Sequence, residues 1–168
     1  MLEEEYVNQL EREFKRYGWE TFREVIPDEC INWNLPFRVD LIVYKPDVGF
    51  IGIEAKSISL NNGGVLAQAH KQIQKYRNKT YFKGKKIYLW ALAIKFNHPL
   101  SKPYEGSVEV LTREFFCGYG IGYILDKKIP SIDFGYSQGW AKIPFDLSNE
   151  RMDIQKIIQS QQKKNPDS

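Results

Sequence analysis

The sequence lacks several features that would assign it to a specialised class of protein. It has only two cysteines, Cys30 and Cys117, which match no spacing of metal ligands. We therefore expect both to be buried thiols in a reducing compartment. No run approaches the roughly 18 apolar residues of a membrane-spanning helix, and the acidic start MLEEEY has no signal-peptide core. These absences predict a cytoplasmic protein that makes no membrane contact.

The chain also has little net charge. Its formal charge is +3 over 168 residues, so bulk charge does not indicate a nucleic-acid-binding protein. The local charge differs, because basic side chains cluster between positions 71 and 86. They are Lys71, Lys75, Arg77, Lys79, Lys83, Lys85 and Lys86. Such a cluster suits phosphate contacts, and it is also typical of ordinary solvated surface, so the charge pattern alone leaves both interpretations open.

Apolar content is ample. Hydrophobic residues make up 42% of the chain and aromatic residues 14%, which is enough for a core without disulfides. The sequence contains no internal repeat, low-complexity segment or interdomain linker. We expect one domain over residues 1–168.

Hydrophobic periodicity and turn residues predict the order of secondary structure. In chain order the elements are a helix at 2–17, strands at 19–26, 38–44 and 50–56, a helix at 65–78, a buried strand at 86–96, a helix at 107–118, a strand at 121–126, an irregular or hairpin-like region at 127–145, and a helix from 149 to about 163. The first three strands follow short turns and the last two follow helical crossovers. This order predicts an α/β (α+β) fold with a mixed sheet, helices on both faces, and 121–126 parallel to 86–96.

The segment 37–56, FRVDLIVYKPDVGFIGIEAK, carries the candidate chemistry. Side chains two residues apart share one face of a strand, so Asp40 lies on the polar face of one arm, and Glu54 and Lys56 lie on that of the next. Pro and Gly make 45–49 a turn. Antiparallel pairing then brings Asp40 close to Glu54. Two carboxylates followed by a lysine are what a divalent-metal hydrolase needs.

These residues resemble the signature of the PD-(D/E)xK nuclease superfamily. Asp40 corresponds to its aspartate, and Glu54-Ala55-Lys56 corresponds to its (D/E)xK tripeptide. The sequence departs from the signature in having Val39, instead of proline, before Asp40. The resemblance implies a restriction-endonuclease-like core of the order αβββαβ.

A second motif extends the resemblance into the following helix. Gln72 and Tyr76 match the QxxxY pattern of RecB-like members of the superfamily. The resemblance covers about residues 1–126. Residues 127–168 have no counterpart in it and form a C-terminal extension that ends in a helix.

The resemblance implies a metal-dependent mechanism. Asp40, Glu54 and the carbonyl of Ala55 would hold Mg²⁺ or Mn²⁺, which are hard cations that prefer oxygen ligands. Lys56 would orient the attacking water or stabilise the charge that develops on the phosphate. No other cofactor is implied. The alternative interpretation of Glu54 and Lys56 is an ordinary solvent-facing ion pair.

Other residues are assigned through the resemblance with alternatives left open. Gln72 would contact the metal shell or the substrate backbone, and Tyr76 the phosphate or the region of Lys56. Tyr76 also fits the apolar stripe of its helix. A glutamate of the first helix often assists the metal in this superfamily. Glu5 is our choice here, with Glu4 and Glu24 as alternatives.

The sequence thus predicts a Mg²⁺- or Mn²⁺-dependent deoxyribonuclease, either an endonuclease or an exonuclease, with DNA as its partner. The alternative is a non-catalytic nucleic-acid-binding or assembly protein on the same fold. In either case the predicted DNA contacts are Lys71, Lys75, Lys83, Lys85 and Lys86. The apolar side of the 149–163 helix could pack on the domain or on a second copy, so a homodimer stays open.

Overall fold

The computed structural model describes residues 2–34, 36–58, 63–77, 80–96, 120–134 and 142–148, together with Gln159 and Gln162. The helices and strands are α1 (Glu3–Arg16), β1 (Glu20–Val25), the 3₁₀ helix η1 (Asp28–Cys30), β2 (Val39–Lys45), β3 (Gly49–Ile58), α2 (Gly63–Arg77), β4 (Tyr81–Phe82), β5 (Lys85–Lys86), β6 (Leu89–Phe96), β7 (Gly122–Leu125), β8 (Ser131–Asp133) and β9 (Lys142–Pro144).

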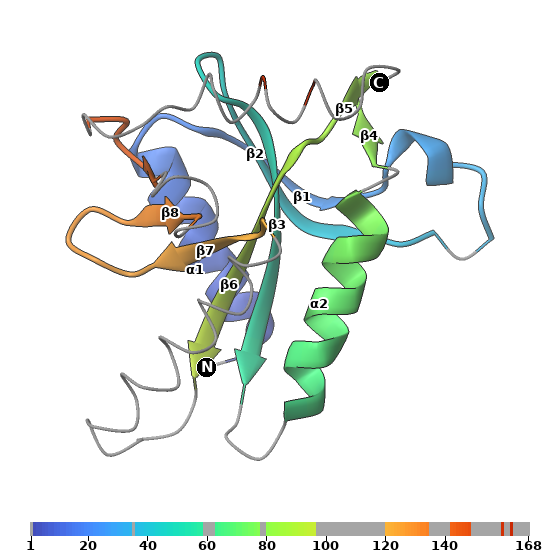
Figure 1. Ribbon diagram of the computed structural model, residues 1–168, viewed down its shortest axis with the longest axis horizontal. Coiled ribbons are helices and arrows are strands. Elements are labelled where there is room, and N and C mark those ends of the chain that lie inside the picture. Colours follow the sequence, from blue (N-terminus) through green and yellow to red (C-terminus); the bar gives the residue numbers. More distant parts are fainter. Residues whose placement is uncertain are drawn as a thin grey trace.

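Seven strands form one mixed sheet in the order β1-β2-β3-β6-β7-β8-β9. The pairs β3–β6 and β6–β7 are parallel, and the other pairs are antiparallel. Helices α1 and α2 pack on opposite faces, each over its own cluster of buried apolar side chains (Figure 1). This confirms the predicted mixed α/β sheet with helices on both faces.

Helix α1 follows the predicted 2–17 segment closely. Its buried side chains are Tyr6, Val7, Leu10 and Phe14, which recur at helical spacing. The first turn is acidic, which suits the positive end of the helix dipole. Gly18 has a φ of +83° directly after the helix and allows the chain to turn into β1.

The β2–β3 hairpin has the predicted antiparallel register, with Leu41 opposite Ile53. Successive side chains alternate between the two faces, so Leu41 and Ile53 pack under α1 whereas Ile42 packs under α2. The prediction that one face of this hairpin is polar is wrong. That face is a second core layer covered by α2, because Ile42 and Trp90 fill it beside the carboxylates.

The predicted continuous strand at 86–96 is also wrong at its start. Strand β6 begins only at Leu89, and the preceding residues form the separate hairpin β4–β5. Its turn uses Lys83 and Gly84 at φ values of 51° and 74°. The Asp28 carboxylate accepts hydrogen bonds from both backbone N–H groups, at 3.3 and 2.8 Å respectively. A side chain of η1 therefore fixes this turn.

The distal half of the sheet confirms one further prediction. Strand β7 pairs in parallel with β6, as expected for the 121–126 segment. The hairpin-like region that follows supplies β8 and β9 to the same sheet. The predicted helices at 107–118 and 149–163 lie outside the described residues, apart from Gln159 and Gln162.

Aromatic contacts join α1 to the turn that follows β9, the last strand of the sheet. The ring of Phe14 stacks on Phe145, with centroids 3.9 Å apart, and meets Trp19 edge to face at 5.5 Å. The Trp19 indole N–H donates to the Phe145 carbonyl at 2.7 Å. Residues near both ends of the described chain therefore share one core.

The expected burial of the cysteine thiols is confirmed for Cys30, which is a buried free thiol, whereas Cys117 lies outside the described residues. Trp90 lies in the core as well. No helix in the described ranges is both long enough and apolar enough to span a membrane.

Candidate active site

Asp40 and Glu54 approach each other at the end of the β2–β3 ladder. The paired register ends at Leu41 and Ile53, and one further step places Asp40 opposite Glu54. The Ala55 backbone N–H donates to Asp40 Oδ2 at 2.9 Å. Because the N–H and C=O of one strand residue point the same way, the Ala55 carbonyl is directed toward β2 as well.

Lys56 lies on the same side of β3 as Glu54. Its Nζ is 3.3 Å from Glu54 Oε1 and 3.8 Å from Glu3 Oε1, and its side chain is only 14% exposed. Burial lowers the pKa of Lys56, but the charges of Glu54, Glu3 and Asp40 outweigh it and raise the pKa above its ordinary value. The lysine therefore stays charged. Because the Lys56 and Glu54 side chains are only 14% and 2% exposed, they do not form the solvent-facing ion pair of the alternative interpretation.

The α2 helix adds Gln72 and Tyr76 to this side of the sheet. Tyr76 is buried, and burial raises the pKa of its hydroxyl. The charges of Glu54 and Asp40 raise that pKa further, whereas a hydrogen bond from the Gln72 side chain opposes the shift. Tyr76 is at the same time a core residue, which confirms its place in the apolar stripe of the helix. Its role at the site stays a prediction.

The protonation of Glu54 is unusual. Burial raises its pKa from 4.5 to about 8, with the neighbouring Asp40 charge as the next cause and the Lys56 ion pair acting in the opposite direction. Burial also raises the pKa of Asp40, opposed first by the Ala55 hydrogen bond and then by Lys56. The Glu54 carboxyl thus keeps its proton to a higher pH than an ordinary glutamate does. A cation at this position would favour its ionised form.

Two buried oxygen atoms at the site have no hydrogen-bond partner within the described part of the chain. They are Glu54 Oε2 and Gln72 Oε1. Buried polar atoms are normally paired, so these two oxygen atoms are available to an external partner. Oxygen atoms from carboxylate, carbonyl and amide groups form a donor set that suits Mg²⁺ or Mn²⁺. Among the described residues, no third His, Cys, Asp or Glu completes a metal-binding cluster.

The glutamate of α1 that approaches the site is Glu3. The carboxylate of Glu5, our choice from the sequence, instead accepts a hydrogen bond from the Leu2 N–H at 3.0 Å. Glu24 lies 3.8 Å from Arg38, and both side chains are exposed. Glu4 is exposed. Glu3 lies three, four and seven residues before the buried Tyr6, Val7 and Leu10. This spacing places it on the same face of α1 as those residues, so the sequence could have identified Glu3 as the glutamate directed toward the sheet.

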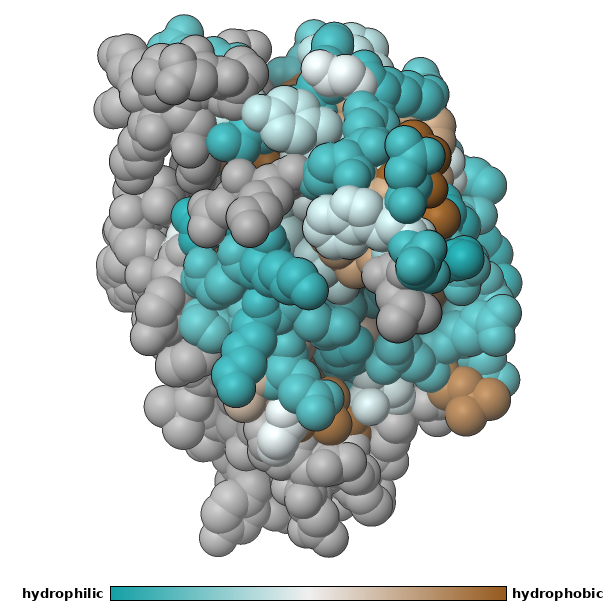
Figure 2. Space-filling view, turned by 90° about the vertical axis from the view of Figure 1, so that its right-hand side faces the viewer, coloured by the Kyte–Doolittle hydropathy of each residue, from teal (hydrophilic) through white to brown (hydrophobic). Residues whose placement is uncertain are grey.

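The predicted DNA-contacting lysines lie mainly on the surface. Lys71 and Lys75 are exposed on α2, Lys83 and Lys85 are exposed in the β4–β5 hairpin, and Lys86 is partly buried. Figure 2 shows the side of the molecule on which α2 lies in Figure 1, and hydrophilic residues cover most of its described surface. The active-site candidates and this surface share one side of the sheet.

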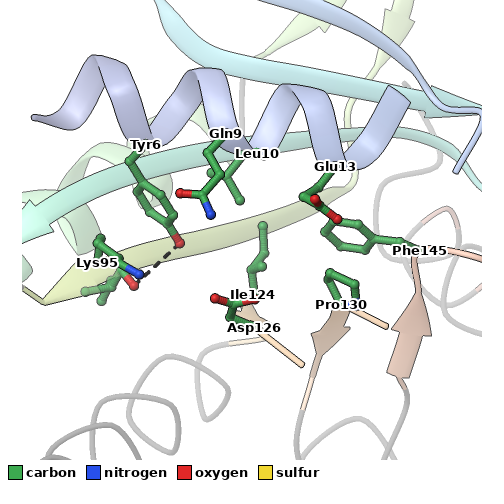
Figure 3. A pocket seen from close by; sticks show the side chains of 10 residues that line it. Tyr6, Gln9, Leu10, Glu13, Lys95, Ile124, Asp126, Pro130 and Phe145 are labelled. Atoms are coloured by element: carbon green, nitrogen blue, oxygen red, sulfur yellow. Dashed lines mark hydrogen bonds between the residues drawn. The ribbon is translucent and has the colours of Figure 1, made fainter. Parts of the chain in front are cut away.

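A cavity of about 220 Å³ lies on the other side, between α1 and the ends of the distal strands (Figure 3). The Tyr6 hydroxyl donates to the Ile94 carbonyl at its edge, at 3.5 Å. Gln9, Glu13 and Asp126 also line it. None of the site residues predicted from the sequence lines this cavity, so it is separate from the carboxylate pair.

No family model matches the chain, and no curated protein matches it. Two solved structures are similar. One is a protein of unknown function, AF1548, with 16% identity, a TM-score of 0.33, and coverage of 61% of this chain and 53% of that chain. The other is SPO1766, a protein of unknown function from Silicibacter pomeroyi, with 18% identity, a TM-score of 0.42, and coverage of 95% and 88%. The chain thus spans about half the length of the first protein. Similarity at this level assigns neither fold family nor function.

Proposed function

We propose that the protein is a Mg²⁺- or Mn²⁺-dependent nuclease that hydrolyses DNA phosphodiester bonds by a PD-(D/E)xK mechanism on a restriction-endonuclease-like core. The observation that carries the proposal is Glu54. It is a carboxyl group only 2% exposed, it faces Asp40, and one of its oxygen atoms has no partner among the described residues. Burying two neighbouring carboxyl groups is costly, so their placement needs a compensating ligand.

The carboxylates and the Ala55 carbonyl would hold the metal ion. The ion would polarise the phosphodiester and lower the pKa of a bound water. Asp40 is already oriented for this role, because the Ala55 N–H holds one of its oxygen atoms. Glu54 would lose its proton on binding the ion, and its free Oε2 would become a ligand.

Lys56 and Tyr76 would act on the substrate. The Lys56 ammonium is charged and adjacent to Glu54, so it can stabilise negative charge on the phosphate or orient the water. The raised pKa of Tyr76 keeps its hydroxyl protonated, and a protonated hydroxyl can donate to a phosphate oxygen. Gln72 would direct its unpaired Oε1 toward the metal shell or the substrate.

The test compares Asp40→Asn and Glu54→Gln with the wild type on single-stranded and duplex DNA, in Mg²⁺, Mn²⁺ or EDTA. We expect metal-dependent cleavage in the wild type and a loss of at least about 100-fold in either variant, since each removes charge from the reacting centre. Asp47→Asn is the matched control, because Asp47 is an exposed carboxylate in the turn of the same hairpin.

A thermal melt of the same proteins gives a readout that does not depend on cleavage. An ion bound only to the folded state raises the melting temperature. We expect Mn²⁺ to raise it in the wild type and in Asp47→Asn, and not in the other two variants. Full cleavage by Glu54→Gln would refute the mechanism. Salt-dependent DNA binding without cleavage in any metal would favour the non-catalytic alternative.

A further inference from the structure

An exposed tryptophan lies at the end of a short series of aromatic rings that leads to the carboxylate pair. Tyr76, which both carboxylates influence, stacks on Phe37 with ring centroids 4.6 Å apart and planes 13° apart. Phe37 in turn meets the Trp33 ring at 6.1 Å and 68°. Trp33 is 49% exposed, whereas Trp19 and Trp90 are 3% and 1% exposed. Core packing thus accounts for two tryptophans and leaves the Trp33 ring open to solvent.

Positive charge accompanies these rings. The Lys75 ammonium lies 5.8 Å from the centroid of Phe37, and Lys71 is exposed one turn earlier on α2. The acidic residues nearest in sequence are directed elsewhere, because Asp28 and Glu29 accept hydrogen bonds from the backbone of the β4–β5 hairpin. The surface around Trp33 therefore combines aromatic faces with cations. This combination suits nucleic acid, whose bases stack while its phosphates meet lysines.

The geometry distinguishes paired from unpaired bases. A base inside a duplex has both faces covered by its neighbours, so only an unpaired base, or the terminal pair at a duplex end, can stack on an external ring. We infer that Trp33 and Phe37 form a stacking platform for an unpaired DNA base beside the phosphate that is cleaved, so that the enzyme acts on DNA with single-stranded regions. The cleavage part of this inference rests on the proposed function, whereas the binding part does not.

The binding test uses DNA in EDTA, where cleavage does not compete. A single-stranded oligonucleotide with 2-aminopurine at successive positions is titrated with protein, next to a blunt duplex of the same sequence. We expect the fluorescence of one or two positions to be quenched by the wild type and by Trp33→Phe, which keeps an aromatic face. Trp33→Ala should bind the single strand roughly 5- to 100-fold more weakly and leave duplex affinity unchanged.

Two further variants control for general effects. Ile31→Ala removes another exposed apolar side chain from the same segment and should leave binding unchanged. Trp33→Leu keeps apolar bulk without an aromatic face, so it replaces Trp33→Ala if the latter fails to fold. Unchanged single-strand binding by Trp33→Leu, or an equal loss for single strand and duplex, would overturn the inference.

Cleavage in Mn²⁺ separates this inference from the proposed function. The wild type should prefer single strands or overhangs over blunt duplex, and Trp33→Leu should lose that preference while it keeps duplex cleavage. Trp33-dependent binding without any cleavage would support the platform and refute the nuclease. Cleavage that depends on Asp40 but shows no Trp33-dependent preference would support the nuclease and overturn the platform.

Discussion

At the scale of single residues, Glu54 is where stability conflicts with the proposed function. An ionised carboxyl group in a core layer next to a second carboxyl is unfavourable for folding. The rise of the Glu54 pKa from 4.5 to about 8 reflects this unfavourable free energy. Lys56, whose Nζ is 3.3 Å from Glu54 Oε1, offsets part of this cost because its charge favours the ionised carboxylate. In the proposed mechanism the same features suit Glu54 to a cation, because a group whose ionised form is disfavoured in the free protein gains most from an added positive charge.

The metal-free protein should therefore lose stability as the pH rises. Glu54 binds its proton more tightly in the folded state, at a pKa of about 8 against 4.5, so the unfolding free energy falls between these pH values. Glu54→Gln removes this decline. In EDTA we expect it to exceed the wild type at pH 8.5 by a few kcal/mol, since each pKa unit is equivalent to about 1.4 kcal/mol.

Urea denaturation at pH 4.0, 6.0 and 8.5 measures this difference. The two proteins should be nearly equal at the lowest pH, where Glu54 is protonated in both the folded and the unfolded state, and should diverge as the pH rises above 4.5. Parallel curves across the three pH values would show that Glu54 ionises normally in the folded protein.

At the scale of elements, β3 and β6 are joined by a contact that only glycine permits. A Cβ atom on Gly52 would lie 2.4 Å from the Trp90 ring, which is buried in the layer under α2. The strand carrying Glu54 and Lys56 therefore lies against a large aromatic side chain, with no room for adjustment at position 52. Trp90 is therefore part of the buried layer under α2, on the same face of β3 as Glu54.

Gly52→Ala should destabilise the protein by about 1–3 kcal/mol, because the added methyl group forces Trp90 or the strand to shift. Gly64→Ala is the matched control. It introduces the same group in α2, where nothing lies within 4 Å, and should be neutral or slightly stabilising. Equal unfolding free energies for the two variants in urea would contradict the tight contact at Gly52.

The elements also show what the sequence could reveal. Helix α1 and the β2–β3 hairpin were predictable because their apolar spacing and turn residues are local signals. The β4–β5 hairpin was not, because two-residue strands show no periodicity and its turn depends on Asp28, over 50 residues away in the chain. Asp40, Glu54 and Lys56 meet as predicted. The burial of Glu54 was missed, because alternation within a hairpin does not show whether a helix covers the second face.

At the scale of the whole molecule, the stack of Phe14 on Phe145 joins α1 to the turn after β9. Both rings are fully buried, and Trp19 completes the cluster through its hydrogen bond to the Phe145 carbonyl. This cluster lies on the α1 side of the sheet, opposite the carboxylate pair. It therefore contributes to stability without contacting the proposed active site.

Phe145→Ala should lower the unfolding free energy by about 3–5 kcal/mol, the usual cost of deleting a buried ring. Cleavage per folded molecule should stay within about twofold of the wild type below the melting transition, since the site residues lie on the other face. Ile129→Ala, which truncates an exposed side chain between β7 and β8, should change neither quantity. Loss of cleavage in fully folded Phe145→Ala would show that the two faces are coupled.

The alternation along β3 has a consequence for how this chain can change. Ile53 and Ala55 belong to the layer under α1, and Glu54 and Lys56, between and after them, belong to the side of α2. Adjacent positions are thus under different constraints, because Ile53 and Ala55 stabilise the fold whereas the proposed function depends on Glu54 and Lys56. Under selection for abundance alone, Ile53 and Ala55 would be retained while Glu54 drifted toward uncharged residues. Redesign of the proposed active site can in the same way proceed without rebuilding the apolar layer under α1.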